Sequence, residues 1–486
     1  MSNNTSKRQS LRLTAIPQSP DDEEHINDYD GWKVPFNNYR IPTISLDGLS
    51  PQQFFDEYVA ARRPVVLKGP LPDVQVPIQK WKSYDYLRQK AGDEKIKVEQ
   101  RASVNDSYGQ GNEVSMTLAD FLDLLAKGND DKHYLTTQDV QANEDGRPDL
   151  MAPLMKRLNQ DFPLRPKLME TLVPQNINLW MGGNSAGTTS GLHHDFHDNL
   201  YLVLRGTKQF LLFSPADALK MQTRGKIDKV HRNGLINYQG APTTAYGADL
   251  KANDAAMAAR ARELAEKRLV RAEEALKQGI EGAEEELQAA EADLEAAMEA
   301  LLDAEMEDGN DDDHGDNIDD DASVATDQEE KEASIGNDAV NHNDSCDEQD
   351  GRRLVDKTIK NPNNFSTASP NGDIDSASDG KRYEQMNANQ AYCEVNEGDV
   401  LYLPASWFHE VISIGATSLM KTSSSNAKSE RNGAHHQGHM ALNYWFHPPD
   451  TLNFDIPYST DFWPNDFKQR FQNENDNITS QPKVIS

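Results

Sequence analysis

Two histidines and an aspartate stand at a spacing suited to a metal site in an oxidising enzyme. His193 and Asp195 are two residues apart, and side chains two apart on an extended segment point to the same face. His409 follows far downstream in Pro-Ala-Ser-Trp-Phe-His, just before an apolar, strand-like run. Two imidazoles and one carboxylate are the ligand set that holds non-haem Fe(II) and leaves positions open for a co-substrate and O₂. The pattern therefore predicts oxidation chemistry rather than simple binding.

Other histidines compete for this assignment. His194 and His197 belong to the same cluster, but a neighbour at the next strand position points to the opposite face, so His193 ranks above both. A second cluster lies in or just beyond a polar segment and is read as loop residues rather than as a second metal site. It comprises His435, His436 and His439.

The acidity of the chain is concentrated in one segment. The 486 residues carry a formal charge of −31, and residues 251–350 hold 33 acidic against 8 basic side chains. The net charge of all other residues is only −6. The acidity therefore characterises an inserted segment and not the substrate. Because no basic patch is concentrated anywhere, there is no strong nucleic-acid signal, and a duplex substrate is disfavoured.

Cysteine usage and hydropathy favour an intracellular protein, cytoplasmic or nuclear. Cys346 falls in a polar stretch and Cys393 beside a strand-like run, so no disulfide framework is expected. The N-terminal residues lack the apolar core of a signal peptide. No apolar run reaches the roughly 18 residues that a membrane-spanning helix needs, so no membrane association is expected.

Composition divides the chain into five segments. They are a disordered N-terminal tail (1–37), the first part of a catalytic domain (38–240), an inserted segment (241–381), the second part of the catalytic domain (382–470) and a C-terminal tail (471–486). Within the first part, Ser50, Pro51 and Gln53 have the pattern of a capped helix start. Apolar residues at helical spacing predict a second helix over 117–125.

Short apolar runs outside the insertion predict a β fold. They are residues 177–182, 200–204, 208–213, 400–404, 410–414 and 440–446. Strands of nearly continuous apolar character suit a closed or double-sheeted architecture of the jelly-roll or cupin type. The predicted fold class is mainly β with flanking helices, a double-stranded β-helix that is interrupted by a helical and disordered acidic insertion.

The insertion has two halves of different composition. Residues 252–306 are rich in Ala, Glu, Leu and Arg without proline, and apolar residues repeat every seven positions from Ile280 to Leu301. This pattern predicts a helical hairpin or an intermolecular coiled coil, which would offer a surface for a partner helix or for self-association. Residues 308–380 are acidic and poor in apolar side chains, which predicts disorder. A tolerated surface insertion is favoured over a dedicated partner site.

Two motifs resemble those of the JmjC family of Fe(II)- and 2-oxoglutarate-dependent oxygenases, in particular its small hydroxylases. Residues 192–201, Leu-His-His-Asp-Phe-His-Asp-Asn-Leu-Tyr, are similar to the family signature Leu-His-X-Asp-X-X-X-Asn-Leu-Tyr. Residues 404–409 are similar to Pro-Ala-X-Trp-Phe-His. The resemblance covers residues 40–240 and 382–450. It is nearest to lysyl hydroxylases of the jumonji-domain-containing protein seven type and more distant from the asparaginyl hydroxylase of hypoxia-inducible factor.

The resemblance implies a ligand set and a co-substrate pocket. The implied iron ligands are His193, Asp195 and His409. The implied contacts of 2-oxoglutarate are Tyr134, Ser190, Asn199, Lys208 and Asn443.

Several of these positions have a second interpretation. On the residues alone, Lys208 is as compatible with a solvent-facing hairpin as with an inward ammonium that needs an anionic partner. The preceding residues Thr188 and Thr189 leave the register of Ser190 open. Two tryptophans near these positions, Trp407 and Trp445, are interpreted as core aromatics.

The resemblance implies a dioxygenase that uses Fe(II), 2-oxoglutarate and O₂, with ascorbate as reductant, to hydroxylate a side chain of a protein substrate. Lysine is the expected target residue. One alternative is an N-methyl-lysine demethylase with the same mechanism, although two cysteines provide no zinc-bound histone-reading module. A second alternative is a non-catalytic cupin-like scaffold, which the complete set of ligand residues disfavours.

Overall fold

The computed structural model describes residues 26–74, 78–102, 111–127, 132–142, 148–183, 187–308, 362–371, 380–416 and 438–479. These residues form two compact units. Unit 1 falls within Met1–Gly247 and Val355–Ser486, and unit 2 falls within Ala248–Leu354. Among the described helices, none is long and apolar enough to cross a membrane.

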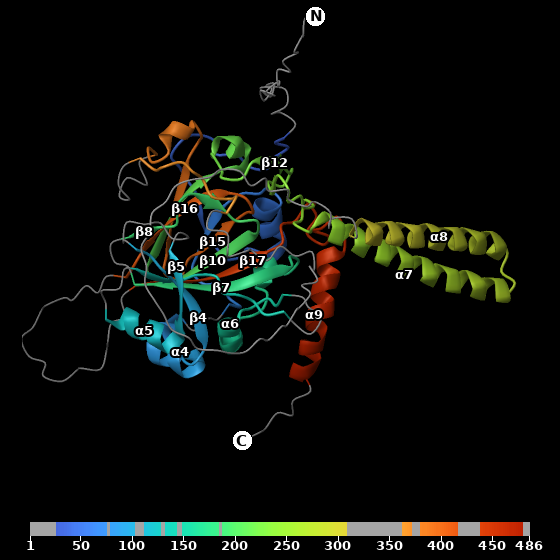
Figure 1. Ribbon diagram of the computed structural model, residues 1–486, viewed down its shortest axis with the longest axis horizontal. Helices are drawn as coiled ribbons and strands as arrows, with labels where there is room; N and C mark the ends of the chain where they lie inside the picture. Colours follow the sequence, from blue (N-terminus) through green and yellow to red (C-terminus); the bar gives the residue numbers. More distant parts are fainter. Residues whose placement is uncertain are drawn as a thin grey trace, which may run out of the picture. The chain divides into compact units, whose positions relative to one another are not determined.

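Two β-sheets build unit 1 (Figure 1). The larger sheet has the order β2 (Thr43–Ser45), β3 (Val65–Lys68), β15 (Val400–Leu403), β10 (Asp198–Arg205), β17 (His439–Phe446), β7 (Pro174–Gly182), β6 (His133–Leu135), β4 (Lys95–Gln100) and β5 (Asn112–Thr117). The smaller sheet has the order β1 (Tyr39–Arg40), β14 (Ala391–Asn396), β11 (Thr207–Phe213), β16 (Phe408–Ile414) and β8 (Thr188–Thr189), and β9 (His193–His194) also pairs with β16. A separate pair consists of β12 (Ile227–Val230) and β13 (Ile236–Tyr238).

The core lies between the two sheets. One cluster of buried apolar side chains joins Tyr201 and Leu401 of the larger sheet to Phe210 and Val395 of the smaller sheet. All eight residues of β10 are buried, which explains why this strand is almost continuously apolar in sequence. The predicted double-sheeted, cupin-like fold is confirmed.

Helices flank the sheets. The predicted capped helix is α2 (Pro51–Phe54), where the side chains of Ser50 and Gln53 each accept from the other's backbone N–H. The predicted second helix is α5 (Leu118–Ala126). The other helical segments of unit 1 are η1 (Phe55–Val59), α3 (Ile78–Trp81), α4 (Tyr84–Ala91), α6 (Pro153–Leu158), η2 (Asn159–Asp161), η3 (Lys167–Met169), η4 (Pro215–Lys220), η6 (Glu384–Met386) and α9 (Phe462–Thr479). Because α9 continues beyond residue 470, the predicted start of the C-terminal tail at residue 471 is wrong.

The structure also corrects the predicted N-terminal tail, 1–37. Residues 26–37 belong to unit 1, and the ring of Trp32 stacks on Trp407 with 5.7 Å between centroids. Burial of aromatic and apolar side chains such as Tyr29 holds this segment against the sheets in spite of its polar composition. The rest of the predicted tail lies outside the described residues.

A second correction concerns the insertion, which composition extended to residue 381. Residues 362–371 belong to unit 1 and hydrogen-bond to it through their backbone. The N–H of Ser366 donates to the carbonyl of Leu192 at 2.8 Å, and this segment therefore joins the strand that carries His193. Backbone pairing needs no apolar side chains, so composition gave no sign of it. The acidic residues between 308 and 362 lie outside the described part of the chain.

Unit 2 is a helical hairpin of α7 (Leu250–Lys277) and α8 (Ala283–Asp308), which is one of the two arrangements that the sequence left open (Figure 1). Gly279 and Gly282 have φ values of 66° and 83° in the connecting turn, a conformation that side-chain-bearing residues rarely adopt. The buried seam consists of alanines seven residues apart, which lets the two backbones approach closely. They are Ala258, Ala265 and Ala272 on α7 and Ala283, Ala290 and Ala297 on α8.

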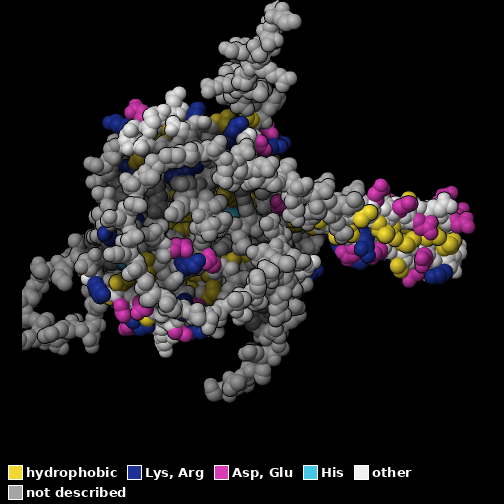
Figure 2. All heavy atoms as spheres, in the orientation of Figure 1, with side chains coloured by type: hydrophobic (Ala, Val, Ile, Leu, Met, Phe, Trp, Pro, Cys, Tyr) yellow, Lys and Arg dark blue, Asp and Glu magenta, His cyan; other side chains and the backbone are white. Residues whose placement is uncertain are grey.

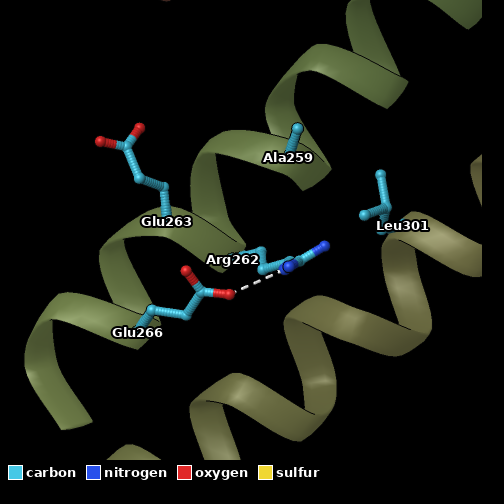
Figure 3. Close-up of a pocket in the computed structure, with 5 residues that line it drawn as sticks. All are labelled: Ala259, Arg262, Glu263, Glu266 and Leu301. Carbon is cyan, nitrogen blue, oxygen red and sulfur yellow. Dashed lines mark hydrogen bonds and ion pairs between the residues drawn. The ribbon is translucent and has the colours of Figure 1, made fainter. Parts of the chain in front are cut away.

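The outer surface of the hairpin mixes apolar and charged side chains (Figure 2). A groove between its helices is lined by Ala259, Arg262, Glu263, Glu266 and Leu301 (Figure 3). Nε of Arg262 donates to Glu266 at 2.9 Å, and both side chains are about half exposed, so this ion pair contributes little stability. The groove contains no metal-ligating histidine or cysteine. The predicted partner helix or self-association stays a prediction.

Candidate active site

The three residues predicted to bind a metal ion lie together in the structure. His193 is on β9, Asp195 follows in the next turn, and His409 is on β16. β9 and β16 pair antiparallel with His193 opposite His409, which unites two motifs that are far apart in sequence. One ligand atom from each residue lies within 4.8 Å of the others. Nε2 of His409 is 3.7 Å from Oδ2 of Asp195, and the two imidazole centroids are 4.3 Å apart.

Backbone carbonyls orient both imidazoles. Nδ1 of His193 is 3.0 Å from the carbonyl oxygen of Gly191, and Nδ1 of His409 is 2.8 Å from that of Trp407. Because a carbonyl oxygen only accepts, each Nδ1 carries the proton and each Nε2 keeps a lone pair for a metal ion. Burial, and next the neighbouring His193, lower the pKa of His409 to about 4, so this imidazole is neutral at neutral pH. Two imidazoles and a carboxylate in this state fit Fe(II).

The rival histidines have other partners. Nε2 of His194 lies 2.7 Å from Oη of Tyr238, and burial lowers the pKa of His194 to about 3. The ring of His197 stacks on Trp445 with 5.7 Å between centroids. Neither joins the metal-ligating group that the described residues form. Of the two expected core aromatics, Trp407 is buried, whereas Trp445 is half-buried.

A buried carboxylate that sequence analysis did not single out connects the two motifs. Asp198 accepts from Nη1 and Nη2 of Arg62 at 2.8 and 2.6 Å and from Oη of Tyr402 at 2.7 Å. It also accepts from the backbone N–H of Ala405 at 2.9 Å, in the motif that precedes His409. A bidentate, fully hydrogen-bonded pair of this kind fixes geometry as well as charge. Asp198 therefore holds the two ligand-bearing segments in register.

Phe365, from the segment that composition assigned to the insertion, packs directly on a predicted metal ligand. Its ring stacks on His193 with 4.8 Å between centroids and 12° between the planes, and the two residues form an antiparallel bridge. The backbone carbonyl of Asn364 accepts from the backbone N–H of His194 at 3.2 Å, and Nδ2 of Asn364 donates to the backbone carbonyl of His194 at 2.5 Å. No sequence signal marked Phe365, because an isolated aromatic in a polar stretch is common.

Lys208 points inward, which settles the two interpretations of its position. Its side chain is fully buried on β11, and Nζ donates to Oγ of Ser413 at 2.5 Å and to Oη of Tyr134 at 3.5 Å. Burial lowers the pKa of Lys208 to about 7. The ammonium forms no ion pair with any described carboxylate, so an anionic ligand fits beside it. Tyr134 thus lies beside Lys208, and the co-substrate contacts of both residues stay predictions.

The two predicted amides face each other on neighbouring strands. Nδ2 of Asn443 donates to Oδ1 of Asn199 at 3.1 Å, and Nε1 of Trp180 donates to Oδ1 of Asn443 at 2.9 Å. This chain of hydrogen bonds fixes the orientation of both amides inside the larger sheet's inner face. The structure thus brings the predicted pair together.

The hydroxyl groups near Lys208 differ from the sequence-based expectation. Oγ of Ser190 already accepts from the backbone N–H of Val411 at 3.0 Å and donates to a neighbouring carbonyl. Thr188, by contrast, lies opposite Ser413, which lies opposite Lys208, so these three side chains form one row across the smaller sheet. Oγ1 of Thr188 is buried and has no partner among the described residues. The register therefore places Thr188, rather than Ser190, in the row of Lys208, with Ser413 between them. The co-substrate contact of Ser190 stays a prediction.

His439 also lies close to these residues, because its ring centroid is 5.5 Å from that of Tyr134. Its interpretation as a loop residue was wrong: it is the first residue of β17, where pairing with Gly182 extends the strand, and it is fully buried. Neither ring nitrogen has a partner within the described residues. Buried polar atoms without partners, together with an ammonium that has no ion pair among the described residues, fit the carboxylate of a 2-oxo dicarboxylic acid. His435 and His436 lie outside the described residues.

Comparisons with known proteins identify the family. A family model for the cupin-like domain matches residues 51–452. JmjC domain-containing protein 4 of Schizosaccharomyces pombe is 35% identical over 459 residues, which cover 89% of this chain and 90% of that protein. The human tRNA wybutosine-synthesizing protein 5 is 28% identical over 39% of this chain and 61% of its own length. The human bifunctional peptidase and (3S)-lysyl hydroxylase JMJD7 is 27% identical over 35% of this chain and 52% of its own length. The chain therefore belongs to the cupin-like JmjC family.

Proposed function

We propose that this chain is an Fe(II)- and 2-oxoglutarate-dependent dioxygenase that hydroxylates a lysine side chain of a protein substrate. The observation that carries the proposal is the convergence of His193, Asp195 and His409 within 4.8 Å, in a fold whose interior also holds the buried ammonium of Lys208. A ligand set of this kind with open positions is typical of non-haem iron oxygenases.

His193, Asp195 and His409 would hold the metal ion, with each imidazole kept in the required tautomer by its backbone carbonyl. When bound, Fe(II) supplies O₂ activation: one oxygen atom enters succinate as 2-oxoglutarate is oxidatively decarboxylated with release of CO₂, and the other oxygen atom is inserted into a substrate C–H bond. Phe365 covers one face of the His193 ring and would shield that face from water.

Lys208 would neutralise the distal carboxylate of 2-oxoglutarate, with Tyr134 donating a hydrogen bond beside it. A buried ammonium is costly without an anion, so the binding energy of the co-substrate includes relief of that cost. Asn199 and Asn443, already oriented by each other and by Trp180, would line the pocket closer to the triad.

One relative supports lysine as the target residue: the name of the human JMJD7 protein includes a (3S)-lysyl hydroxylase activity. Another relative is named for synthesis of the tRNA base wybutosine, but this chain has no concentrated basic patch for a duplex. Oxidation of an N-methyl group by the same site would instead release formaldehyde, which makes demethylation a distinguishable outcome.

The proposal is tested with the purified full chain, Fe(II), 2-oxoglutarate and ascorbate, incubated with cellular proteins under isotopically labelled O₂. We expect labelled oxygen in lysine residues by mass spectrometry, no formaldehyde, and no label with Asp195→Ala. Formaldehyde release without labelled lysine would show that the reaction is demethylation and not hydroxylation. Label in RNA and not in protein when cellular RNA is supplied in a parallel incubation, or no 2-oxoglutarate consumption at all, would overturn the proposal.

A further inference from the structure

The strongest unexplained feature outside the metal triad is the imidazole of His439. Its side chain is fully buried at the start of β17, and neither Nδ1 nor Nε2 has a hydrogen-bond partner among the described residues. Buried polar side chains in folded proteins nearly always have at least one partner. Two unpartnered nitrogens on one buried ring therefore point to a group that binds there.

The backbone makes room for this ring beside the proposed co-substrate pocket. Gly182 on β7 pairs with His439 on the neighbouring strand β17 and with Tyr134 on the other neighbouring strand, β6. Both rings lie close to the glycine. A Cβ atom at Gly182 would lie 2.9 Å from Nε2 of His439 and 3.0 Å from Cδ2 of Tyr134. The ring centroids of His439 and Tyr134 are 5.5 Å apart. A side chain at position 182 would thus remove this arrangement.

The charges around the imidazole define the ligand that it suits. The charged groups that act on His439 are the cations Lys208, Arg205 and Arg101, and no described carboxylate is among them. Burial first, and then these cations, keep the pKa of His439 well below its usual range. The ring is therefore neutral and has one N–H to donate. A neutral donor among cations suits an anion, and Nζ of Lys208 lies 5.5 Å from the ring centroid of the same Tyr134.

We propose that His439 donates a hydrogen bond to the distal carboxylate of the co-substrate, beside the ammonium of Lys208 and the hydroxyl groups of Tyr134 and Thr188. The inference rests on the proposed function and adds to it a residue that selects 2-oxo dicarboxylic acids. A 2-oxo acid that lacks the distal carboxylate leaves the His439 N–H unpaired and gains nothing from it. Thr188, in the row of Lys208 on the smaller sheet, has a buried hydroxyl group without a partner among the described residues.

The test is a titration of the full chain loaded with Mn(II), which replaces Fe(II) without redox turnover. The two ligands are 2-oxoglutarate and 2-oxobutanoate, which keeps the 2-oxo acid group but lacks the distal carboxylate. In His439→Phe we expect the affinity for 2-oxoglutarate to fall about tenfold to a hundredfold, the range for loss of one hydrogen bond to a charged group. The affinities for Mn(II) and for 2-oxobutanoate should not change. His231→Phe, at a histidine outside the pocket that also has an unpartnered Nε2, should change none of the three.

Each other outcome has a defined meaning. An unchanged 2-oxoglutarate affinity in His439→Phe, or an equal loss for both acids, overturns the role of His439 while leaving the proposed function standing. If the unaltered chain binds Mn(II) but not 2-oxoglutarate, the proposed function itself fails. If His439→Phe does not fold, the inference is tested by imidazole ¹⁵N spectra of the unaltered chain loaded with Zn(II). The signal of His439 is assigned as the one that is missing from the spectrum of His439→Gln. This signal should shift when 2-oxoglutarate is added and not when 2-oxobutanoate is added, and the absence of a shift overturns the inference.

Discussion

The backbone N–H of Ser406 donates a 2.7 Å hydrogen bond to the carbonyl oxygen of Asp195. This bond joins the segment that ends in His409 directly to the segment that carries His193 and Asp195. Ser406 has a φ of 60°, which is unfavourable for a residue with a side chain. Its Oγ accepts from the N–H of Ile236 at 3.2 Å, which helps to hold that conformation. The positions of the metal-ligating candidates are thus set by backbone contacts between distant parts of the chain.

The buried Asp198–Arg62 pair should be the most sensitive part of this framework. Asp198→Asn leaves the guanidinium of Arg62 buried without a charge partner, and loss of one member of such a pair costs about 3–5 kcal/mol. We therefore expect the free energy of unfolding to fall by about that amount in urea titrations. The exposed pair Asp30–Arg232 provides the control, since Asp30→Asn should cost less than about 1 kcal/mol. Equal effects of the two substitutions would contradict the proposed framework.

Phe365→Ala should loosen His193 and weaken metal binding. The stacked ring contributes about 0.5–1.5 kcal/mol beyond its burial, so we expect Mn(II) affinity to fall about two- to tenfold. Anaerobic calorimetric titration measures this change. The control is Phe36→Ala, because Phe36 is 59% exposed and should not affect metal affinity. An unchanged affinity in Phe365→Ala would show that the stack does not position the ligand.

Co-substrate binding should depend on pH through Lys208. Its pKa is lowered by burial to about 7, so the ammonium predominates below that pH and the neutral amine above it. Affinity for 2-oxoglutarate should therefore be highest below pH 7 and fall up to about tenfold per unit as pH rises above it. Above pH 7, binding should take up close to one proton, which calorimetry in buffers of different ionisation enthalpy measures. Lys208→Arg, which stays charged, should bind without this proton uptake; the same uptake in that variant would assign the titration to another group.

Two deletions should separate unit 2 from the segment that follows it. Replacement of residues 248–354 by a flexible linker removes only unit 2, so Mn(II) and 2-oxoglutarate affinities should be retained. Replacement of residues 248–371 also removes Phe365 and the backbone bonds to Leu192, and should lower metal affinity and stability. Equal behaviour of the two deletions in metal titration and thermal unfolding would contradict the role given to the segment.

The sequence predicted those parts of the site that lie in short, dense motifs. The two-residue spacing of His193 and Asp195 predicted side chains on one face, and the chemistry of these side chains indicated a third ligand, His409. The structure brings the three side chains together, although Asp195 lies just beyond the strand of His193. The short, nearly continuous apolar runs likewise predicted the strands, because burial between two sheets favours apolar side chains on the strands. Heptad spacing predicted paired helices and left the choice between a hairpin and an intermolecular coiled coil open. Ile280, the first residue of that repeat, lies in the connecting turn and is 54% exposed.

Features that depend on long-range register could not be predicted. The row Thr188–Ser413–Lys208 exists only because β8, β16 and β11 are neighbours, and no local pattern specifies that order. Phe365 binds through backbone pairing from a segment whose composition is that of a disordered chain. His439 follows a polar stretch, and its burial depends on pairing with Gly182.

The most direct test of the central claim is succinate formation from 2-oxoglutarate by the purified chain with Fe(II) and ascorbate under air, beside Asp195→Ala. Asp195 is the only carboxylate in the triad, so its replacement removes the one anionic ligand. The proposed function predicts turnover by the unaltered chain and none by Asp195→Ala. Equal succinate formation by both, or no turnover together with no anaerobic binding of Fe(II) and 2-oxoglutarate, would contradict it.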